Sequence, residues 1–493
     1  MAMNKIRSYI FIGLSMLSLS SCNEWLDVKP ETEVREDDLF SSYKGYKEAL
    51  AGCYSAMTSR DLYGEKLTIS DVECLANLWN QPSKSYNPAL YDLHIHDYED
   101  EYARKDIKTI YSDLYNVIVQ ANSIINHITA NPASIPAENQ RNIIEGEARA
   151  VRAFCHFDVL RLFGQMPQNA TKTVELPYSE SNDINTLPPY YSFEQFAAKV
   201  LADLDIAEEK LKTSDPVMEF SYDELAGADS KLADQLPDDD FLLNRRYRFN
   251  YWAVRALKAR VYLYIGDKAK AYNEAMAVIN AQIKGKSVVS LSSKSDYENK
   301  KYSTPSECLM QLYNVDLLDF SIDIIGGDPE RNVNTDRQLY LTSSNFEKKL
   351  FAGANTTSDV RYLNLWDRTT KSSTGSKYPT IKKYFKVTTM PLLRLSEMYL
   401  IAMETATNLA EANSLYKTFM AARNVNITTD IESEVDLLDK VINEYRLDFY
   451  AEGQMFYCYK RLAVKSMLFS YENMGEEQYI IPLPSSEFNP AGK

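Results

Sequence analysis

Histidine is scarce in this chain, with only four among 493 residues, and no two cysteines have the Cys-x-x-Cys spacing. Zinc sites are usually built from cysteine thiolates and histidine imidazoles, so this sequence offers few ligands for one. Histidine is also the side chain used most often as a general acid or base. We therefore predict neither a zinc enzyme nor a site of histidine-based proton transfer.

Sequence motifs that mark the common catalytic sites are missing as well. The chain contains no Gly-x-Ser-x-Gly, no His-Glu-x-x-His and no Walker-type loop. A glycoside hydrolase needs two carboxylates about 5 to 10 Å apart, and 69 Asp and Glu residues supply some such pair by chance. We predict that the protein is not an enzyme, and a surface glycoside hydrolase is the weaker alternative.

Positive charge is in deficit. Lys and Arg number 54 against 69 Asp and Glu, which gives a formal net charge of -15. This charge repels phosphate backbones and anionic lipid headgroups, so it argues against nucleic-acid binding and against electrostatic attachment to a membrane. We expect a neutral or cationic ligand.

Long apolar runs are absent except for a short one of eleven residues at 9–19. A membrane-spanning helix needs about 20 apolar residues, whereas a shorter run after a positively charged start is typical of a signal peptide. The run ends in Leu19-Ser20-Ser21-Cys22, which resembles the bacterial lipobox, where the peptidase cuts before an acylated cysteine. We predict a signal peptide at 1–21 and lipidation of Cys22, by palmitate or similar chains, since two or three such chains anchor a protein stably.

Five further cysteines lie far apart in the sequence. Their number is odd, and an isolated cysteine in apolar surroundings is usually a buried free thiol. We predict free thiols, with one disulfide as the alternative. The five residues are Cys53, Cys74, Cys155, Cys308 and Cys458.

Helical periodicity dominates the chain after the leader. Apolar residues recur every three or four positions over 40–53 and 107–121, as expected for amphipathic helices that face a core. Residues 145–163 are also helical in pattern, and Gly164 with Pro167 supplies a stop signal. The predicted fold class is therefore mostly α.

Residues 252–279 indicate how the helices pair. With Gly266 as the turn, the small residues Ala259 and Ala271 fall on the two flanking helices, where they allow close approach. The pattern resembles a tetratricopeptide unit, and residues 392–423 form a second candidate pair. Because one hairpin cannot bury its apolar face alone, we predict a tetratricopeptide-like scaffold of about four helix pairs. An ordinary helical hairpin is the alternative.

Two segments lack a sustained helical period. Residues 73–101 mix aromatic and polar side chains, as long functional loops do. Residues 287–360 hold short β-rich runs at 288–289, 309–313 and 339–342, which predict an irregular, loop-rich insertion lobe with some strand. The predicted parts are a signal peptide (1–21), a lipidated tether (22–40), a helical scaffold (41–286), the insertion lobe (287–360) and a C-terminal helical part (361–493).

Several longer motifs follow one another along the chain. The most specific is Gly146-Glu147-Ala148-Arg149-Ala150, followed by Asp158-Val159-Leu160-Arg161-Leu162-Phe163-Gly164. The others are Cys22-Asn23-Glu24-Trp25-Leu26, Lys258-Ala259-Arg260-Val261-Tyr262-Leu263, Leu393-Arg394-Leu395-Ser396-Glu397 and Ile481-Pro482-Leu483-Pro484. Together they resemble the SusD/RagB family of outer-membrane nutrient-uptake lipoproteins of Bacteroidetes.

This resemblance implies a lipid-anchored protein of the outer membrane, exposed at the cell surface, that sits as a lid on a SusC-like TonB-dependent transporter. It implies that the protein captures a glycan and hands it to the channel without cleaving it. A peptide ligand, as in RagB-like proteins, is one alternative, and a purely protein-binding adaptor is another. The chain departs from the family near Glu452, where Tyr445, Met455 and Cys458 replace residues that are usually charged. We therefore expect an ion-pair cluster to be missing there.

A glycan receptor needs flat aromatic surfaces flanked by planar polar groups, because sugars offer C–H faces and hydroxyl edges. The segment 73–101 and the insertion lobe both supply this mixture, whereas we expect Trp366 to be structural and Arg149 with Arg152 to pair with neighbouring helices. The predicted ligand-binding residues are Trp79, Asn80, Gln81, Tyr86 and Tyr91 in the first segment and Tyr313, Asn314, Asp316, Asp328 and Arg331 in the lobe.

We predict no cofactor. His94 and His96 could bind a metal on one face of a strand, but a polar loop is the favoured interpretation. Residues 213–240 are polar and predict an exposed excursion, whose acidic run Asp238-Asp239-Asp240 could hold a structural calcium ion. That run lacks the alternating ligand spacing of a calcium loop, so we favour a solvated acidic run.

Overall fold

The computed structural model describes residues 35–183, 185–227, 237, 239–326, 332–470 and 472–488. The predicted signal peptide, the lipidation site at Cys22 and most of the tether lie outside the described residues, as do the predicted ligand contacts Asp328 and Arg331.

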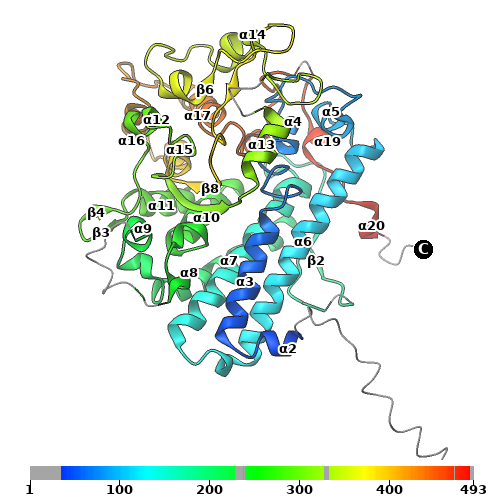
Figure 1. Ribbon diagram of the computed structural model, residues 1–493, viewed down its shortest axis with the longest axis vertical. Coiled ribbons are helices and arrows are strands. Elements are labelled where there is room, and N and C mark those ends of the chain that lie inside the picture. Colours follow the sequence, from blue (N-terminus) through cyan, green and yellow to red (C-terminus); the bar gives the residue numbers. More distant parts are fainter. Residues whose placement is uncertain are drawn as a thin grey trace, which may run out of the picture.

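Helices make up most of the fold, as predicted (Figure 1). The longer helices are α3 (Tyr43–Met57), α6 (Glu101–Ala130), α7 (Glu138–Phe163), α8 (Phe193–Lys212), α10 (Tyr251–Tyr264), α11 (Lys268–Ile279), α13 (Leu317–Ile325), α15 (Leu395–Thr405), α16 (Leu409–Ala422) and α17 (Glu434–Asp448). The shorter ones are α2 (Glu36–Leu39), α4 (Asp71–Leu75), α5 (Pro88–His94), α9 (Tyr222–Leu225), α12 (Lys294–Glu298), α14 (Ser343–Asn345), α18 (Met455–Arg461), α19 (Glu476–Tyr479) and α20 (Ser485–Phe488). Single turns are η1 (Pro132–Ser134), η2 (Pro216–Met218), η4 (Asp240–Leu242) and η5 (Arg245–Tyr247), and the π-helical turns are η6 (Phe346–Leu350) and η7 (Arg361–Leu365).

The strands are short and form two-stranded antiparallel pairs. The pairs are β1 (Leu176–Pro177) with β2 (Tyr190–Tyr191), β3 (Gln282–Ile283) with β4 (Lys286–Ser287), β5 (Cys308–Tyr313) with β8 (Thr389–Arg394), and β6 (Trp366–Asp367) with β7 (Thr380–Ile381). The β5–β8 pair joins the insertion lobe to the C-terminal part.

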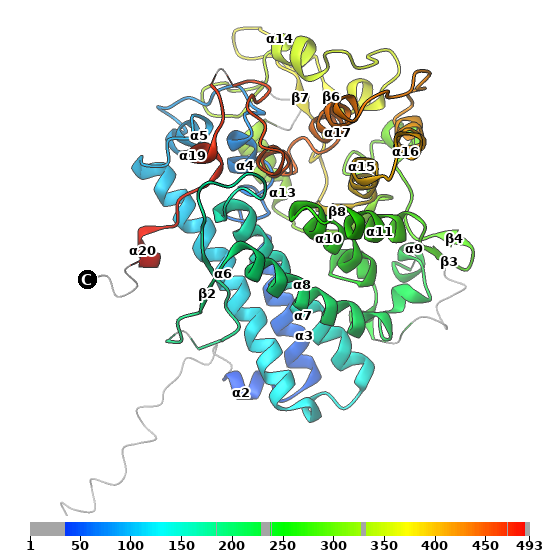
Figure 2. The ribbon, with the colours of Figure 1, turned by 180° about the vertical axis from the view of Figure 1, so that it is seen from behind.

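Helices α3, α6, α7 and α8 form a bundle in the lower half of the molecule (Figures 1 and 2). At the crossing of α7 and α8, a Cβ atom on Gly146 would come 2.9 Å from Leu211 Cγ, so glycine permits the close approach. Arg152 and Asp203 form a buried ion pair between the same helices, with Arg152 Nε 2.7 Å from Asp203 Oδ2. Arg149 also reaches Asp203, at 3.2 Å. The predicted pairing of these arginines with a neighbouring helix is confirmed.

Two helical hairpins continue from the bundle: α10 with α11 packs against α8, and α15 with α16 packs against α11. Gly266 forms the first turn with a φ of +86°, a conformation that glycine adopts without strain. Asn250 caps α10, accepting a hydrogen bond from the Ala253 N–H at 3.1 Å. Both hairpins match the predicted pairs, and their tetratricopeptide-like character stays a prediction.

Three expectations for the irregular regions were wrong. Residues 73–101 contain part of α4 and all of α5, and of the three predicted β runs only 309–313 is a strand. The run at 339–342 forms no strand and bonds instead to Asn80 and to Ile324. The start of 213–240 is not exposed, since Asp215 is buried as the partner of Arg245 at 2.9 Å.

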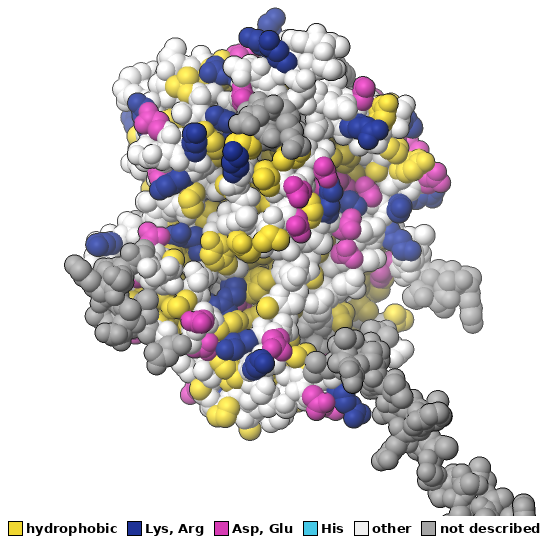
Figure 3. Space-filling model, in the orientation of Figure 1, with side chains coloured by type: hydrophobic (Ala, Val, Ile, Leu, Met, Phe, Trp, Pro, Cys, Tyr) yellow, Lys and Arg dark blue, Asp and Glu magenta, His cyan; other side chains and the backbone are white. Residues whose placement is uncertain are grey.

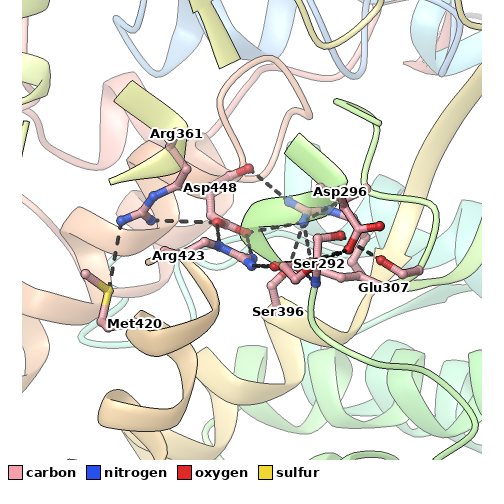
Figure 4. A network of polar contacts seen from close by, with 12 residues as sticks. Ser292, Asp296, Glu307, Arg361, Ser396, Met420, Arg423 and Asp448 are labelled. Carbon is pink, nitrogen blue, oxygen red and sulfur yellow. Dashed lines mark hydrogen bonds and ion pairs between the residues drawn. The ribbon is translucent and has the colours of Figure 1, made fainter. Parts of the chain in front are cut away.

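The missing ion-pair cluster near Glu452 was also predicted wrongly, because a buried network occupies that place. Glu452 accepts from Lys383 Nζ at 2.5 Å and from Arg394 Nε at 2.9 Å. Asp448, four residues earlier at the end of α17, accepts from Arg423 Nε at 2.7 Å and from Arg394 Nη1 at 3.2 Å. The positive partners come from three other elements: Arg394 from β8, Arg423 from just after α16 and Lys383 from the turn after β7. A motif around Glu452 alone therefore does not reveal them. In Figure 4, Asp448 lies between Arg361 and Arg423. We call Glu307, Arg361, Lys383, Arg394, Arg423, Asp448 and Glu452 the Asp448 network.

The predicted state of the thiols is confirmed, because Cys53, Cys74, Cys155, Cys308 and Cys458 are all free and buried. Trp366 is 2% exposed, which confirms its structural role. Among the described residues, no helix is both long and apolar enough to cross a membrane.

Candidate functional site

Four hydrogen bonds fasten the segment 73–101 to the insertion lobe, three of them made by Asn80 and one by Asn87. Asn80 donates its backbone N–H to the Tyr340 carbonyl oxygen at 3.0 Å, and its side-chain oxygen accepts from the Thr342 N–H at 2.9 Å. The Asn87 side-chain amide donates to the Arg337 carbonyl oxygen at 2.9 Å. Both views place α4, α5 and α13 together in the upper half (Figures 1 and 2). The two regions selected by sequence for ligand binding therefore lie side by side.

A surface hollow of about 540 Å³ lies between these two regions, which we call the α5–α13 hollow. This volume falls in the range of small-ligand sites, about 300 to 1,000 Å³. The hollow is lined by Ser85, Tyr86 and Asn87 before and at the start of α5, by Ile322 and Asp323 of α13, and by Asn334, Arg337 and Gln338 of the lobe.

Tyr86 gives the hollow an aromatic surface. The side chain is 52% exposed, and the guanidinium carbon of Arg337 lies 5.3 Å from its ring centroid. A cation over one face of a ring holds the ring in place by cation–π attraction. The arrangement combines an exposed aromatic ring with a planar hydrogen-bond donor.

The other wall of the hollow is held by its own hydrogen bonds. Gln338 accepts from the Asn334 N–H at 2.8 Å and donates to the Ile322 carbonyl oxygen at 2.7 Å. Asp323 pairs with Arg60 at 3.2 Å, and both side chains are partly exposed. This wall offers carboxylate, amide and guanidinium groups that can bond sugar hydroxyls. On the face that carries α13, side chains of both charges occur with apolar atoms between them (Figure 3).

Trp79 is a core residue, which corrects its predicted contact with ligand. The side chain is 2% exposed, its indole N–H donates to the Ile69 carbonyl oxygen at 2.9 Å, and its ring meets the Tyr450 ring edge-on at 4.9 Å. A sugar stacks only on an exposed aromatic face. Trp79 therefore anchors the segment that carries Asn80 and Tyr86.

The remaining predicted residues of the first segment differ in position. Gln81 is exposed next to Asn80. Tyr91 lies on α5 under the Lys84 ammonium, 5.2 Å from the ring centroid. Neither side chain lines the α5–α13 hollow.

In the lobe, Tyr313 and Asn314 lie at the end of β5, away from the hollow. Tyr313 is 56% exposed and meets Tyr247 edge-on at 6.1 Å. Asn314 is buried: its side chain donates to the Thr58 carbonyl oxygen at 3.1 Å and accepts from the Asp316 N–H at 2.9 Å. Asn314 therefore shapes a turn, and Tyr313 is a second exposed ring at the opposite end of α13.

Sequence reasoning missed Asp323, Asn334, Arg337 and Gln338. The available signal was the mostly polar stretch 332–338, but nothing in the sequence shows which part of the lobe faces the first segment. That position follows from the hydrogen bonds of Asn80 and Asn87.

Metal binding finds no support among the described residues, where no three His, Cys, Asp or Glu side chains are grouped as metal ligands. The two histidines considered lie at the end of α5 and in the turn after it. Burial lowers the pKa of both His94 and His96 to about 4. The ring of His96 instead bonds the Leu75 carbonyl oxygen at 2.9 Å, which closes the turn.

Comparison with known proteins gives relatives along the whole described chain. Residues 24–263 match a family described as "Starch-binding associating with outer membrane", and residues 258–488 match the "SusD family". The "SusD-like protein P2" of Formosa agariphila is 21% identical over 534 residues, which cover 96% of this chain and 95% of that protein. "SusD-like protein P25" of the same organism is 22% identical over 292 residues, or 56% of this chain. The chain spans under half the length of P25 and of the related P38, at 46% and 42%.

Solved structures share the fold. A SusD superfamily protein from Bacteroides thetaiotaomicron superposes with a TM-score of 0.69 at 21% identity, over 91% of this chain and 98% of that one. A structure described as "Laminarin binding SusD-like protein" superposes with a TM-score of 0.62 at 15% identity, over 90% and 96% of the two chains. The two adjoining family matches and this shared mostly helical fold confirm the resemblance seen in the motifs: the chain belongs to the SusD/RagB family.

Proposed function

We propose that this protein is a nutrient-binding lipoprotein of the outer membrane that captures an oligosaccharide or polysaccharide at the α5–α13 hollow. The observation that carries the proposal is the half-exposed Tyr86 ring, held under Arg337 between two segments far apart in sequence. A laminarin-binding relative of the same fold supports a glycan as the ligand class.

The groups in the hollow suit a neutral sugar. Its C–H face stacks on the open side of Tyr86, and its hydroxyls bond to Arg337, Asn87 and Asp323 at the edge. Stacking supplies affinity, whereas the planar guanidinium, amide and carboxylate set the orientation. None of these groups needs to move a proton or form a covalent bond, so the proposal is binding without cleavage.

Attachment and delivery form the second part of the proposal. Acyl chains on Cys22 hold the protein on the outer membrane at the cell surface, and a SusC-like TonB-dependent transporter receives the glycan. Membership of a family described by its association with the outer membrane supports this placement. The lipobox-like sequence before Cys22 supports the anchor.

The test is calorimetry with the lipid-free mature protein. Laminarin, starch fragments, other polysaccharides and a set of peptides are titrated separately, and each mixture is then analysed for cleavage products. We expect saturable heat with at least one polysaccharide and no products. Binding to peptides alone would favour a RagB-like peptide receptor, products would indicate a hydrolase, and the absence of binding to the whole panel would favour an adaptor; each of these results contradicts the proposal.

A further inference from the structure

A second exposed aromatic ring lies at the end of α13 opposite to the α5–α13 hollow. Tyr313 is 56% exposed, and its ring meets the Tyr247 ring edge-on, with the two centroids 6.1 Å apart. The backbone that carries it is fixed by the β5–β8 ladder, in which Tyr313 is the partner of Thr389. The Tyr313 ring is therefore held in place and largely open to solvent, as the Tyr86 ring is in the hollow.

One face of α13 connects the two rings. The exposed or partly exposed positions include 316, 319, 320 and 323, and the buried ones are 317, 321, 324 and 325. Because residues three and four apart lie on the same face of a helix, this open face extends from the turn after Tyr313 to Asp323, which lines the hollow. Figure 1 shows α13 on the near side of the molecule, between α4 and the β5–β8 strands.

The loop after α3 forms a wall beside this open face. Near the start of α13, the Asn314 side-chain amide donates to the Thr58 carbonyl oxygen at 3.1 Å. Further along, the guanidinium carbon of Arg60 lies 4.8 Å from the centroid of the Phe320 ring, and Arg60 pairs with Asp323 at 3.2 Å. The wall thus adds a planar guanidinium and the face adds carboxylates, both of which can bond sugar hydroxyls.

A ligand that contacts both rings must follow α13. The helix has nine residues and, at a rise of about 1.5 Å per residue, is about 14 Å long. A single sugar ring bound in the hollow therefore does not reach Tyr313. We propose that the glycan site continues from the α5–α13 hollow along the open face of α13 to Tyr313, and that the ligand is an extended chain of several sugar units.

The extended site rests on the proposed function and adds to it a minimum length of the ligand and a second stacking residue. Once one part of a chain is stacked on Tyr86, the next part meets Tyr313 at a high effective concentration, so long chains bind more tightly than short ones. Short fragments contact only the hollow, and their affinity is independent of Tyr313.

The first experiment measures affinity against chain length with the lipid-free mature protein. Laminarin and starch fragments, sized from disaccharide to decasaccharide, are titrated by calorimetry, and any other polysaccharide that binds is cut by partial acid hydrolysis and sized in the same way. We expect the affinity to rise about tenfold once the chain is long enough to reach Tyr313. Equal affinity for short and long fragments would overturn the extended site alone, whereas no binding by any fragment or polymer would overturn the proposed function with it.

Two variants at Tyr313 assign the gain in affinity. Tyr313→Ala should remove the gain of long fragments and leave the affinity for short fragments unchanged, whereas Tyr313→Phe keeps the ring and should keep the gain. Tyr190→Ala, which removes a ring that is 43% exposed on β2, is the matched control and should behave like the unchanged protein. A gain that survives in Tyr313→Ala, or an equal loss for all lengths, would refute the extended site.

A crystal structure with the longest bound fragment gives a check that does not depend on any variant. We expect sugar density that starts at Tyr86, follows α13 and ends at Tyr313. Density confined to the α5–α13 hollow would limit the site to the hollow and would contradict the proposed extension.

Discussion

Asn80 and Thr342, which are 262 residues apart in sequence, are joined by a hydrogen bond of 2.9 Å from the Thr342 N–H to the Asn80 side-chain oxygen. The same oxygen accepts from the Asn345 side-chain amide at 3.3 Å. The Asn80 side chain, together with that of Asn87, therefore holds the first segment of the site against the insertion lobe.

Replacing this amide should separate the two walls of the hollow. In Asn80→Ala the Thr342 N–H loses its partner, which costs about 1 to 3 kcal/mol of stability, and the glycan affinity falls because Tyr86 and Arg337 lose their relative position. Chemical denaturation and calorimetry measure the two effects. Gln81→Ala, at the exposed neighbouring position, is the control and should change neither; equal effects in both variants would contradict the role of Asn80.

Tyr86 is expected to supply stacking energy. Tyr86→Ala should lower the affinity for the glycan about tenfold, since an aromatic contact contributes roughly 0.5 to 1.5 kcal/mol beyond its buried area. Tyr190→Ala removes a ring of similar exposure, 43% against 52%, from the distant strand β2. The affinity of that control should match the unchanged protein. A Tyr86 variant with full affinity would move the binding site away from the hollow.

Replacing glycine by alanine should have different effects on stability at two helical positions, because only Gly146 lies at the close crossing of α7 and α8. Gly146→Ala places a Cβ atom 2.9 Å from Leu211 Cγ and should cost about 1 to 3 kcal/mol through overpacking. Gly52→Ala on α3 meets its nearest atom, Gln120 Oε1, at 3.7 Å. Because alanine favours helix by about 1 kcal/mol over glycine, this second variant should be neutral or more stable. Urea denaturation of both variants checks the difference in sign.

The Asp448 network should make the protein sensitive to acid. Burial alone would raise the pKa of Asp448, but the Arg423 and Arg394 guanidiniums hold it below its usual value. The ionised carboxylate thus stabilises the fold above the unfolded pKa, and this contribution is lost as the pH falls below about 4. Asp448→Asn should cost about 3 to 5 kcal/mol at pH 7. Asp430→Asn, which removes a surface pair with Lys417, is the control and should cost under about 1 kcal/mol.

Glu73 predicts a change of the opposite sign at higher pH. Burial raises the pKa of Glu73 to about 8, although its Oε1 accepts from the Gly453 N–H at 2.9 Å. Between the unfolded pKa near 4.3 and about 8, the folded state binds the extra proton, so stability falls as the pH rises, by at most about 1.4 kcal/mol per pH unit. Unfolding free energies at pH 5.5 and 8.5 test this slope. Glu73→Gln should flatten it, whereas the exposed Glu298→Gln should leave it unchanged.

The helices could be predicted because their signals are local. The apolar spacing over 40–53 and the stop at Gly164 are readable in a single stretch of chain. The buried network around Glu452 could not be predicted, because Lys383 and Arg423 reach it from other elements. Trp79 was mistaken for a ligand contact because its loop composition is that of an exposed site, whereas its burial depends on Tyr450, far away in sequence.

The Asp448 network also sets an order for folding. Arg361, Arg394 and Arg423 precede Asp448 in the chain, and all three lie within 3.7 Å of its carboxylate. Glu307 and Asp359 can pair with these arginines earlier in the chain, but the acid that all three share is present only once α17 has been made. We therefore expect a chain truncated before residue 448 to be cleaved faster in limited proteolysis than the full chain.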